Sequence, residues 1–154
     1  MKILFILEGD LDVHNWSGTT LSLCNVLSDH GMKVLTLEIH LPKYIRAINK
    51  WKRKVLNHSG DLSRGRLCMD YRRKLIQKAL WQDEFDAIFC VGSIDAAAIS
   101  EDCGIPVYYY TDGTMAIMKG YYSEFSNWDS QTLKDAEDAE LLAAANAQKT
   151  GGVY

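Results

Sequence analysis

The sequence predicts an α/β domain built on a Rossmann-like parallel sheet with helices on both faces. Its length of 154 residues is the usual size of one domain. A composition of 47% hydrophobic and 24% charged residues, with only 2 prolines, is typical of a globular fold. Short apolar runs alternate with segments of helical periodicity, which is the pattern of strand–helix–strand units.

The first forty residues form one such unit. A continuous apolar run over residues 3–7, ended by Glu8, predicts a strand that is buried on both faces. Apolar residues at helical spacing then predict a helix that opens at Ser17-Gly18-Thr19-Thr20 and ends at Gly31. The run over residues 33–39 predicts the second strand.

The same pattern returns in the second half of the chain. Residues 87–92 predict a third strand, residues 95–103 a short helix, and residues 107–110 a fourth strand. A helix rich in alanine and acidic residues is expected over residues 129–148. The apolar pair at 153–154 resembles the start of another strand, so we expect that the chain is cut at its C-terminus.

The middle of the chain is strongly basic. Residues 43–78 hold twelve lysines and arginines against two aspartates, and they predict helices over 44–56 and 67–81. The first of these is predicted to be amphipathic and to contact anionic lipid or an anionic acceptor. The alternative is a solvated charged face on a helix that packs against the domain. The apolar residues of that helix are Tyr44, Ile45, Ile48, Trp51, Val55 and Leu56, and the basic residues of its other side are Arg46, Lys50, Arg53 and Lys54.

Several functional classes lack their motifs in this sequence. The four cysteines have no CxxC spacing, which favours reduced thiols and a cytoplasmic location. The histidines lack metal-ligand spacing, and a GxGxxG fingerprint is missing, so we expect no metal and no dinucleotide cofactor. We also expect no nucleic-acid partner. The first apolar run is too short for a signal peptide or a membrane span.

Candidate site residues follow the first and the fourth strand, because ligands bind at the carboxyl ends of parallel strands. Ser17, Gly18 and Thr19 offer backbone N–H groups at a helix N-terminus, which favours phosphate. Asp112 can accept a hydrogen bond from a sugar hydroxyl or act as a base, and Thr111 adds a hydroxyl. Each of these residues also fits an ordinary helix cap or turn.

Glu140 is the remaining candidate. Helical spacing places it among apolar residues of the last helix, so its carboxylate must be paired, hydrogen-bonded or facing a cleft. A contact with substrate and a structural pair with an arginine both remain open.

Three segments, taken in order, carry a family resemblance. The first is Trp16-Ser17-Gly18-Thr19 with the helix that follows it, the second comprises residues 85–90 and 105–114, and the third joins residues 121–125 to the helix that carries Glu140. Together they resemble the N-terminal domain of family 4 glycosyltransferases of the GT-B type. Many relatives have paired glycines where Ser17-Gly18 stands here, and a histidine where Thr111-Asp112 stands.

The resemblance implies one half of a GT-B architecture. Residues 1–154 would be the acceptor-side domain of a hexosyltransferase that uses a nucleotide-sugar donor without a metal cofactor. Asp112 would be catalytic, and Ser17, Gly18, Thr19, Thr111 and Glu140 would contact substrate. Most groups that hold the donor diphosphate would belong to a second domain, absent from these residues. The alternative is a non-catalytic Rossmann-like module that binds an anionic partner or surface, in the cytoplasm or peripherally at the membrane.

Overall fold

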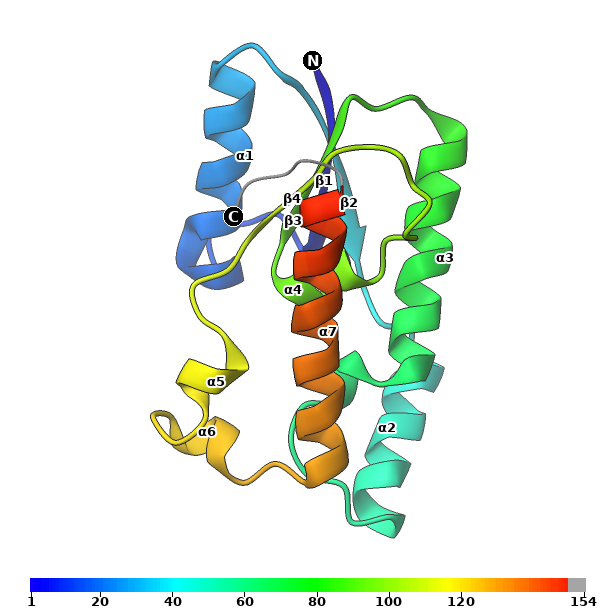
Figure 1. Ribbon diagram of the computed structural model, residues 1–154, viewed down its shortest axis with the longest axis vertical. Coiled ribbons are helices and arrows are strands. Elements are labelled where there is room, and N and C mark those ends of the chain that lie inside the picture. Colours follow the sequence, from blue (N-terminus) through cyan, green and yellow to red (C-terminus); the bar gives the residue numbers. More distant parts are fainter. Residues whose placement is uncertain (150–154) are drawn as a thin grey trace.

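The computed structural model describes residues 1–149 and contains a four-stranded parallel sheet (Figure 1). The strands are β1 (Lys2–Glu8), β2 (Lys33–Ile39), β3 (Ala87–Val91) and β4 (Val107–Tyr110), in the order β2-β1-β3-β4. The Rossmann-like α/β fold class is confirmed. The further strand expected at 153–154 lies outside the described residues.

Seven α-helices and two 3-10 turns surround the sheet within the described residues. The helices are α1 (Thr19–Asp29), α2 (Lys43–Val55), α3 (Arg66–Gln82), α4 (Ser93–Ala97), α5 (Met115–Met118), α6 (Ser123–Ser126) and α7 (Ser130–Lys149). The 3-10 turns are η1 (Asn15–Gly18) and η2 (Leu62–Arg64). Within residues 1–149, none of the helices combines the length and hydrophobicity that a membrane-spanning segment needs.

The side chains of β1 alternate between two apolar clusters. Leu4 and Ile6 pack on one face with residues of α3, α4 and α7, whereas Phe5 and Leu7 pack on the other with residues of α1. Five consecutive residues of β1 are buried, because helices cover both faces of this central strand. The expected burial of the first strand on both faces is therefore confirmed.

The prediction of a helix over residues 95–103 is wrong at both ends of the helix. It begins at Ser93, directly after Gly92, and its last α-helical residue is Ala97. Ala98 and Ile99 stay buried but continue through tighter turns, since Ile99 N–H donates to the carbonyl of Ala96 at 3.3 Å. Burial therefore continues past the helix end, and the sequence pattern extended the helix too far. The short helices α5 and α6 were not expected, because four residues are too few to show a period.

The strand order creates a crevice at the carboxyl edge of the sheet. From β1 the chain crosses to β2 on one side, and it later returns to place β3 on the other side of β1. The loops that follow β1 and β3 therefore leave the sheet toward opposite faces. Such a topological switch point is where open α/β sheets bind their ligands.

Candidate functional site

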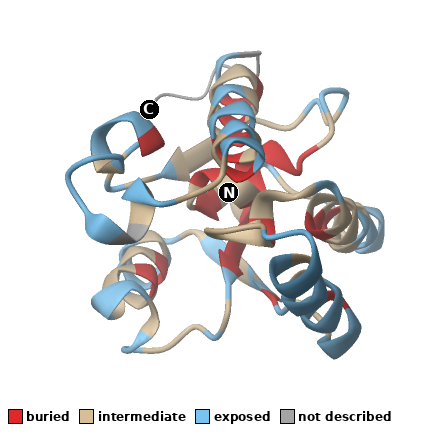
Figure 2. Cartoon of the chain, turned by 90° about the horizontal axis from the view of Figure 1, so that it is seen from below, coloured by how far each residue is buried: buried red, intermediate tan, exposed pale blue. Residues whose placement is uncertain are grey.

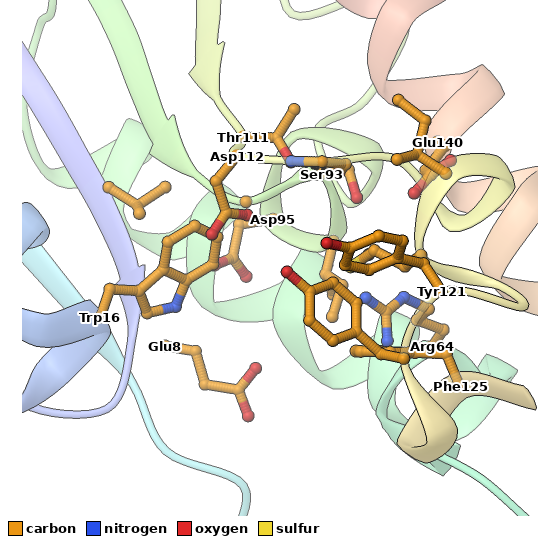
Figure 3. Close-up of a pocket in the computed structure, with 17 residues that line it drawn as sticks. Glu8, Trp16, Arg64, Ser93, Asp95, Thr111, Asp112, Tyr121, Phe125 and Glu140 are labelled. Atoms are coloured by element: carbon orange, nitrogen blue, oxygen red, sulfur yellow. Dashed lines mark hydrogen bonds between the residues drawn. The ribbon is translucent and has the colours of Figure 1, made fainter.

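A cavity of about 740 Å³ lies at this edge of the sheet. Its wall includes the end of β1, the segments after β3 and β4, the turn η2 and the helix α7. Figure 3 shows Glu8, Trp16 and Asp112 on one side of the opening, facing Arg64, Tyr121 and Phe125 on the other. Polar groups from these five separate parts of the chain thus converge on one cavity.

Aromatic rings form much of the cavity wall. Tyr121 is 79% exposed and Tyr122 50%, and their rings meet edge to face at 4.9 Å. Phe125 continues this cluster at 6.3 Å from Tyr122, and Trp16 stands on the opposite side. Aromatic faces that remain open to a cavity offer flat apolar surface to a ligand.

An unusual turn carries Trp16 to the cavity. Trp16 and Ser17 have positive φ angles of 49° and 53°, a conformation that costs a non-glycine residue of order 1–3 kcal/mol. The preceding residue, Asn15, anchors the turn, because its side-chain amide donates to the carbonyls of Glu8 at 2.8 Å and Asp10 at 2.9 Å. The strained turn thus holds the indole beside the end of β3, near Gly92.

The three residues of this loop that were predicted from sequence do not line the cavity, although Trp16 beside them does. Gly18 caps α1 and Thr19 is its first residue, as the N-terminal position predicted for them requires. The cavity wall contains Trp16 from this loop, but not Ser17, Gly18 or Thr19. The loop therefore meets the cavity through an aromatic ring rather than through the three residues selected from sequence.

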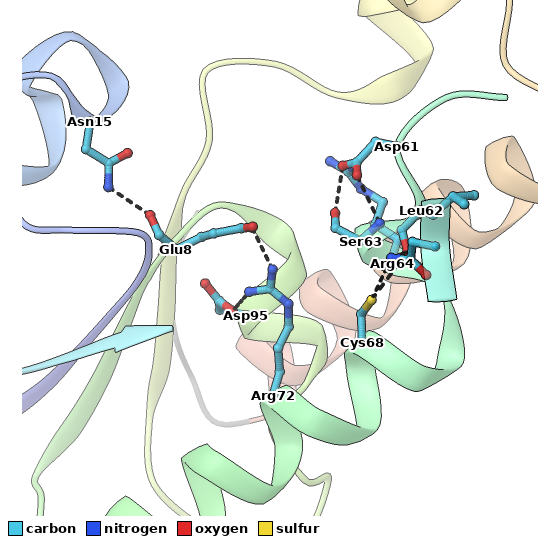
Figure 4. Close-up of polar contacts among 10 residues, drawn as sticks. Glu8, Asn15, Asp61, Leu62, Ser63, Arg64, Cys68, Arg72 and Asp95 are labelled. Carbon is cyan, nitrogen blue, oxygen red and sulfur yellow. Dashed lines mark hydrogen bonds and ion pairs between the residues drawn. The ribbon is translucent and has the colours of Figure 1, made fainter. Parts of the chain in front are cut away.

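A buried arginine holds two carboxylates at the floor of the cavity (Figure 4). Arg72 of α3 is fully buried and donates to Asp95 Oδ1 at 2.5 Å and to Glu8 Oε2 at 2.6 Å. Burial opposes its charge, but Asp95 and Glu8 outweigh this and raise the pKa of Arg72 above its usual value. Burial raises the pKa of Asp95, and the neighbouring Arg72 opposes that rise. Glu8 is the more accessible carboxylate of the pair, with a side chain 46% exposed.

Arg64 brings a positive charge to the cavity wall. Asp61 shapes the turn around it by accepting from Ser63 N at 2.9 Å and from Arg64 Nη1 at 2.7 Å. The guanidinium also lies over the ring of Trp128, 5.8 Å from its centre. With 13% of its side chain exposed, Arg64 is held in place by its neighbours and still reaches the cavity.

The cavity brings together three of the residues predicted from sequence: Thr111, Asp112 and Glu140. Thr111 closes its turn by donating to the carbonyl of Gly113 at 2.8 Å, which leaves Asp112 exposed. Glu140 Oε1 accepts from the backbone N–H of Met115 at 2.8 Å. Burial raises the pKa of Glu140, although this hydrogen bond partly opposes the rise. The prediction that Glu140 is hydrogen-bonded or faces a cleft is confirmed.

Other residues that line the cavity were not predicted from the sequence. Glu8 ends the first strand, so the rule that selected Asp112 could also have selected Glu8. Tyr121 and Tyr122 had a compositional signal, two adjacent tyrosines outside any regular element. Arg64 and Asp95 had none, because each reaches the cavity through packing between elements distant in sequence.

Within residues 1–149, one group of side chains has a geometry that could hold a metal ion. Asp10, Glu38 and His40 bring their ligand atoms within 4.8 Å of one another. All three are exposed, and His40 Nε2 lies 3.5 Å from Asp10 Oδ1. The group lies outside the set of residues that line the cavity.

The arrangement of the cavity favours a ligand with hydroxyl groups and an apolar face. Glu8, Asp112 and Glu140 supply carboxylate acceptors, Arg64 supplies donors, and aromatic rings supply stacking surface. Comparison of the chain with protein-family models, with curated proteins and with solved structures gives no match.

Proposed function

We propose that this chain is the acceptor-side half of a nucleotide-sugar-dependent glycosyltransferase, and that its cavity binds the acceptor. The observation that carries the proposal is the pairing of open aromatic rings with carboxylates at the topological switch point of the sheet. A sugar ring presents C–H groups on its faces and hydroxyls at its edge. Rings such as Trp16 and Tyr121 suit the faces, and carboxylates such as Asp112 suit the hydroxyls.

The proposal assigns a role to each predicted site residue. Asp112 is exposed at the cavity and is the proposed base or hydrogen-bond acceptor for the attacking hydroxyl. Thr111 and Glu140 contact the acceptor from the same wall. The backbone of Ser17 in η1, and of Gly18 and Thr19 at the start of α1, would face the donor diphosphate, with most of its stabilisation supplied by a second domain.

A non-catalytic binding module is the second candidate. It is favoured by the basic helix α2, which offers a charged surface away from the cavity. The four free cysteines fit a reducing compartment, so we propose a cytoplasmic location for either function.

Saccharide binding by the 154-residue chain tests the proposal. A panel of monosaccharides, disaccharides and polyols is titrated by calorimetry and by NMR. We expect at least one to bind, and Trp16→Ala or Asp112→Asn to weaken its affinity about tenfold or more, which is roughly 1.4 kcal/mol. Trp81→Ala is the matched control, because Trp81 is 84% exposed and lies outside the cavity.

Two results would overturn the proposal. The first is that none of the saccharides in the panel binds. The second is that Trp16→Ala and Asp112→Asn weaken saccharide affinity no more than the control variant does. The chain alone is expected to bind acceptor without transferring sugar, since the groups that stabilise the leaving diphosphate are assigned to the second domain. Turnover of a sugar nucleotide by these 154 residues, well above its hydrolysis in buffer, would contradict that division of labour.

A further inference from the structure

The helix α2 leaves its apolar stripe without a partner. Tyr44, Ile48, Trp51 and Val55 follow one another at spacings of four, three and four residues, so they share one side of the helix. Their exposed fractions are 58%, 38%, 56% and 56%, and Ile45 is the buried residue of the helix. Figure 2 shows α2 exposed along most of its length. An amphipathic helix normally buries such a stripe against its own domain, and this one does not.

The domain holds α2 by another side. Ile45 is buried, and Asn49 Nδ2 donates to Cys68 Sγ at 3.4 Å. Arg53 Nη2 donates to the carbonyl of Gly60 at 2.7 Å. At about 100° per residue, these positions lie on average roughly a quarter-turn or more from the stripe. The helix therefore packs against the domain with its charged face in solvent, as the alternative predicts, but the packed side is largely polar and the apolar stripe stays exposed as well.

Basic residues occupy the rest of the exposed surface of α2. Lys43, Arg46, Lys50 and Lys54 are all exposed, and none of them forms an ion pair with a residue in the described part of the chain. Their charges are therefore free to meet an external anionic surface. At about 100° per residue, Lys43, Lys50 and Lys54 flank the apolar stripe on the side away from the domain, whereas Arg46 lies nearly opposite the stripe.

We propose that α2 docks on an anionic lipid bilayer, with its apolar stripe inserted at the headgroup level and its basic residues on lipid phosphates. Exposed stripes of this kind mark interaction sites. A helix with aromatic residues on one face and lysines on the other is suited to lie in the plane of a membrane surface. Trp51 and Tyr44 favour a bilayer over an acidic protein, since their amphipathic rings prefer the headgroup region.

The position of α2 in the fold agrees with docking. The helix extends beyond the carboxyl edge of the sheet, at the same end of the molecule as α5 and α6 (Figure 1). A bilayer at this end would contact α2 without displacing the sheet or the helices that cover it. The inference does not depend on the proposed function, because it uses no residue of the cavity.

Flotation of the 154-residue chain with vesicles tests the proposal. Vesicles of phosphatidylcholine with phosphatidylglycerol at 3:1 are compared with pure phosphatidylcholine. We expect binding to the anionic vesicles only, and a loss of at least tenfold with Trp51→Ser or with the pair Lys50→Glu and Lys54→Glu. The matched controls are Trp81→Ser and the pair Lys74→Glu and Lys78→Glu, which make the same changes on exposed positions of α3.

The possible outcomes distinguish a lipid bilayer from a second copy of the chain as the partner of the apolar stripe. Equal binding to both kinds of vesicle, or the same loss in the control variants, overturns the proposal. Failure to float with anionic vesicles overturns it as well. If size-exclusion chromatography then gives a dimer that Trp51→Ser converts to a monomer, the stripe is an interface between two copies of the chain.

Discussion

Replacement of Arg72 by methionine removes the cation that holds two carboxylates at the floor of the cavity. Methionine keeps the aliphatic volume of the side chain, but it leaves Asp95 buried without a partner, with 2% of its side chain exposed. Removing one partner of a buried ion pair costs about 3–5 kcal/mol. Glu8, with 46% of its side chain exposed, can be hydrated by water and should add little to this cost.

The expected loss is large enough to measure by two methods. Urea unfolding at pH 7 should show the lower free energy of unfolding, and Tm should fall by about 10 °C, at roughly 2–4 °C per kcal/mol for a chain of this size. Arg73→Met is the matched control on the same helix. The side chain of Arg73 is 41% exposed, and its ion pair with Asp70, at 3.4 Å between Nη1 and Oδ1, is on the surface. This control should change stability by less than about 0.5 kcal/mol.

Two further measurements identify the buried charge as the cause. In the double variant Arg72→Met with Asp95→Asn the uncompensated carboxylate is gone, so much of the lost stability should return. In the single variant, burial raises the pKa of Asp95 without opposition from Arg72. The cost of the folded carboxylate is then complete above that raised pKa and absent below the unfolded pKa of about 3.9. The difference in free energy of unfolding between the variant and the wild type should therefore narrow as the pH is lowered from 7 toward 4.

The explanation would be refuted by a loss below about 1 kcal/mol, which is less than any broken buried pair is expected to cost. It would also fail if the double variant were no more stable than Arg72→Met, or if the gap stayed constant with pH. Either result would mean that Arg72 contributes through packing and not through its charge.

Two further predictions concern Glu140 in the cavity wall and the contact between Gly60 and Trp128. Burial raises the pKa of Glu140, so its charge costs stability above that pKa and none below the usual value near 4.5. Glu140→Gln should therefore unfold at a higher temperature than the wild type at pH 7, by a margin that disappears near pH 4, and a lower Tm at pH 7 would contradict this. Gly60 has a φ of +87°, and a Cβ atom there would lie 2.4 Å from Trp128 Cγ. Gly60→Ala should lower the free energy of unfolding by more than about 1 kcal/mol in urea unfolding. Gly31→Ala, at a φ of +79° with open space around it, should cost less, and an equal cost would show that contact with Trp128 is unimportant.

Much of the fold could be predicted from the sequence because its signals are local. The continuous apolar run before Glu8 predicted a strand buried on both faces, and the ranges 33–39 and 107–110 match β2 and β4 residue for residue. Periodicity also predicted α2, α3 and α7 to within one or two residues at their ends. Strands and helices of this length repeat often enough for their period to be visible.

Part of the candidate site also followed from local position. Asp112 and Thr111 stand directly after β4, where a parallel sheet exposes its loops, and both line the cavity. Glu140 was marked by its place on the apolar side of a helix, because a carboxylate there needs a partner. Each inference used one element and its period, and did not require knowledge of which elements are neighbours.

The tertiary structure alone decided which distant residues meet. Arg72 reaches Glu8 across 64 positions and Asp95 across 23, and no periodicity in the sequence links such positions. Trp16, and not Ser17, faces the cavity because of the strained turn that the Asn15 side chain anchors. The residue pattern gave no sign of this turn. Periodicity also showed that α2 is amphipathic, but not which of its sides the domain would cover. That choice depends on the packing of α2 beside η2 and α3, which leaves Trp51 and its neighbours exposed.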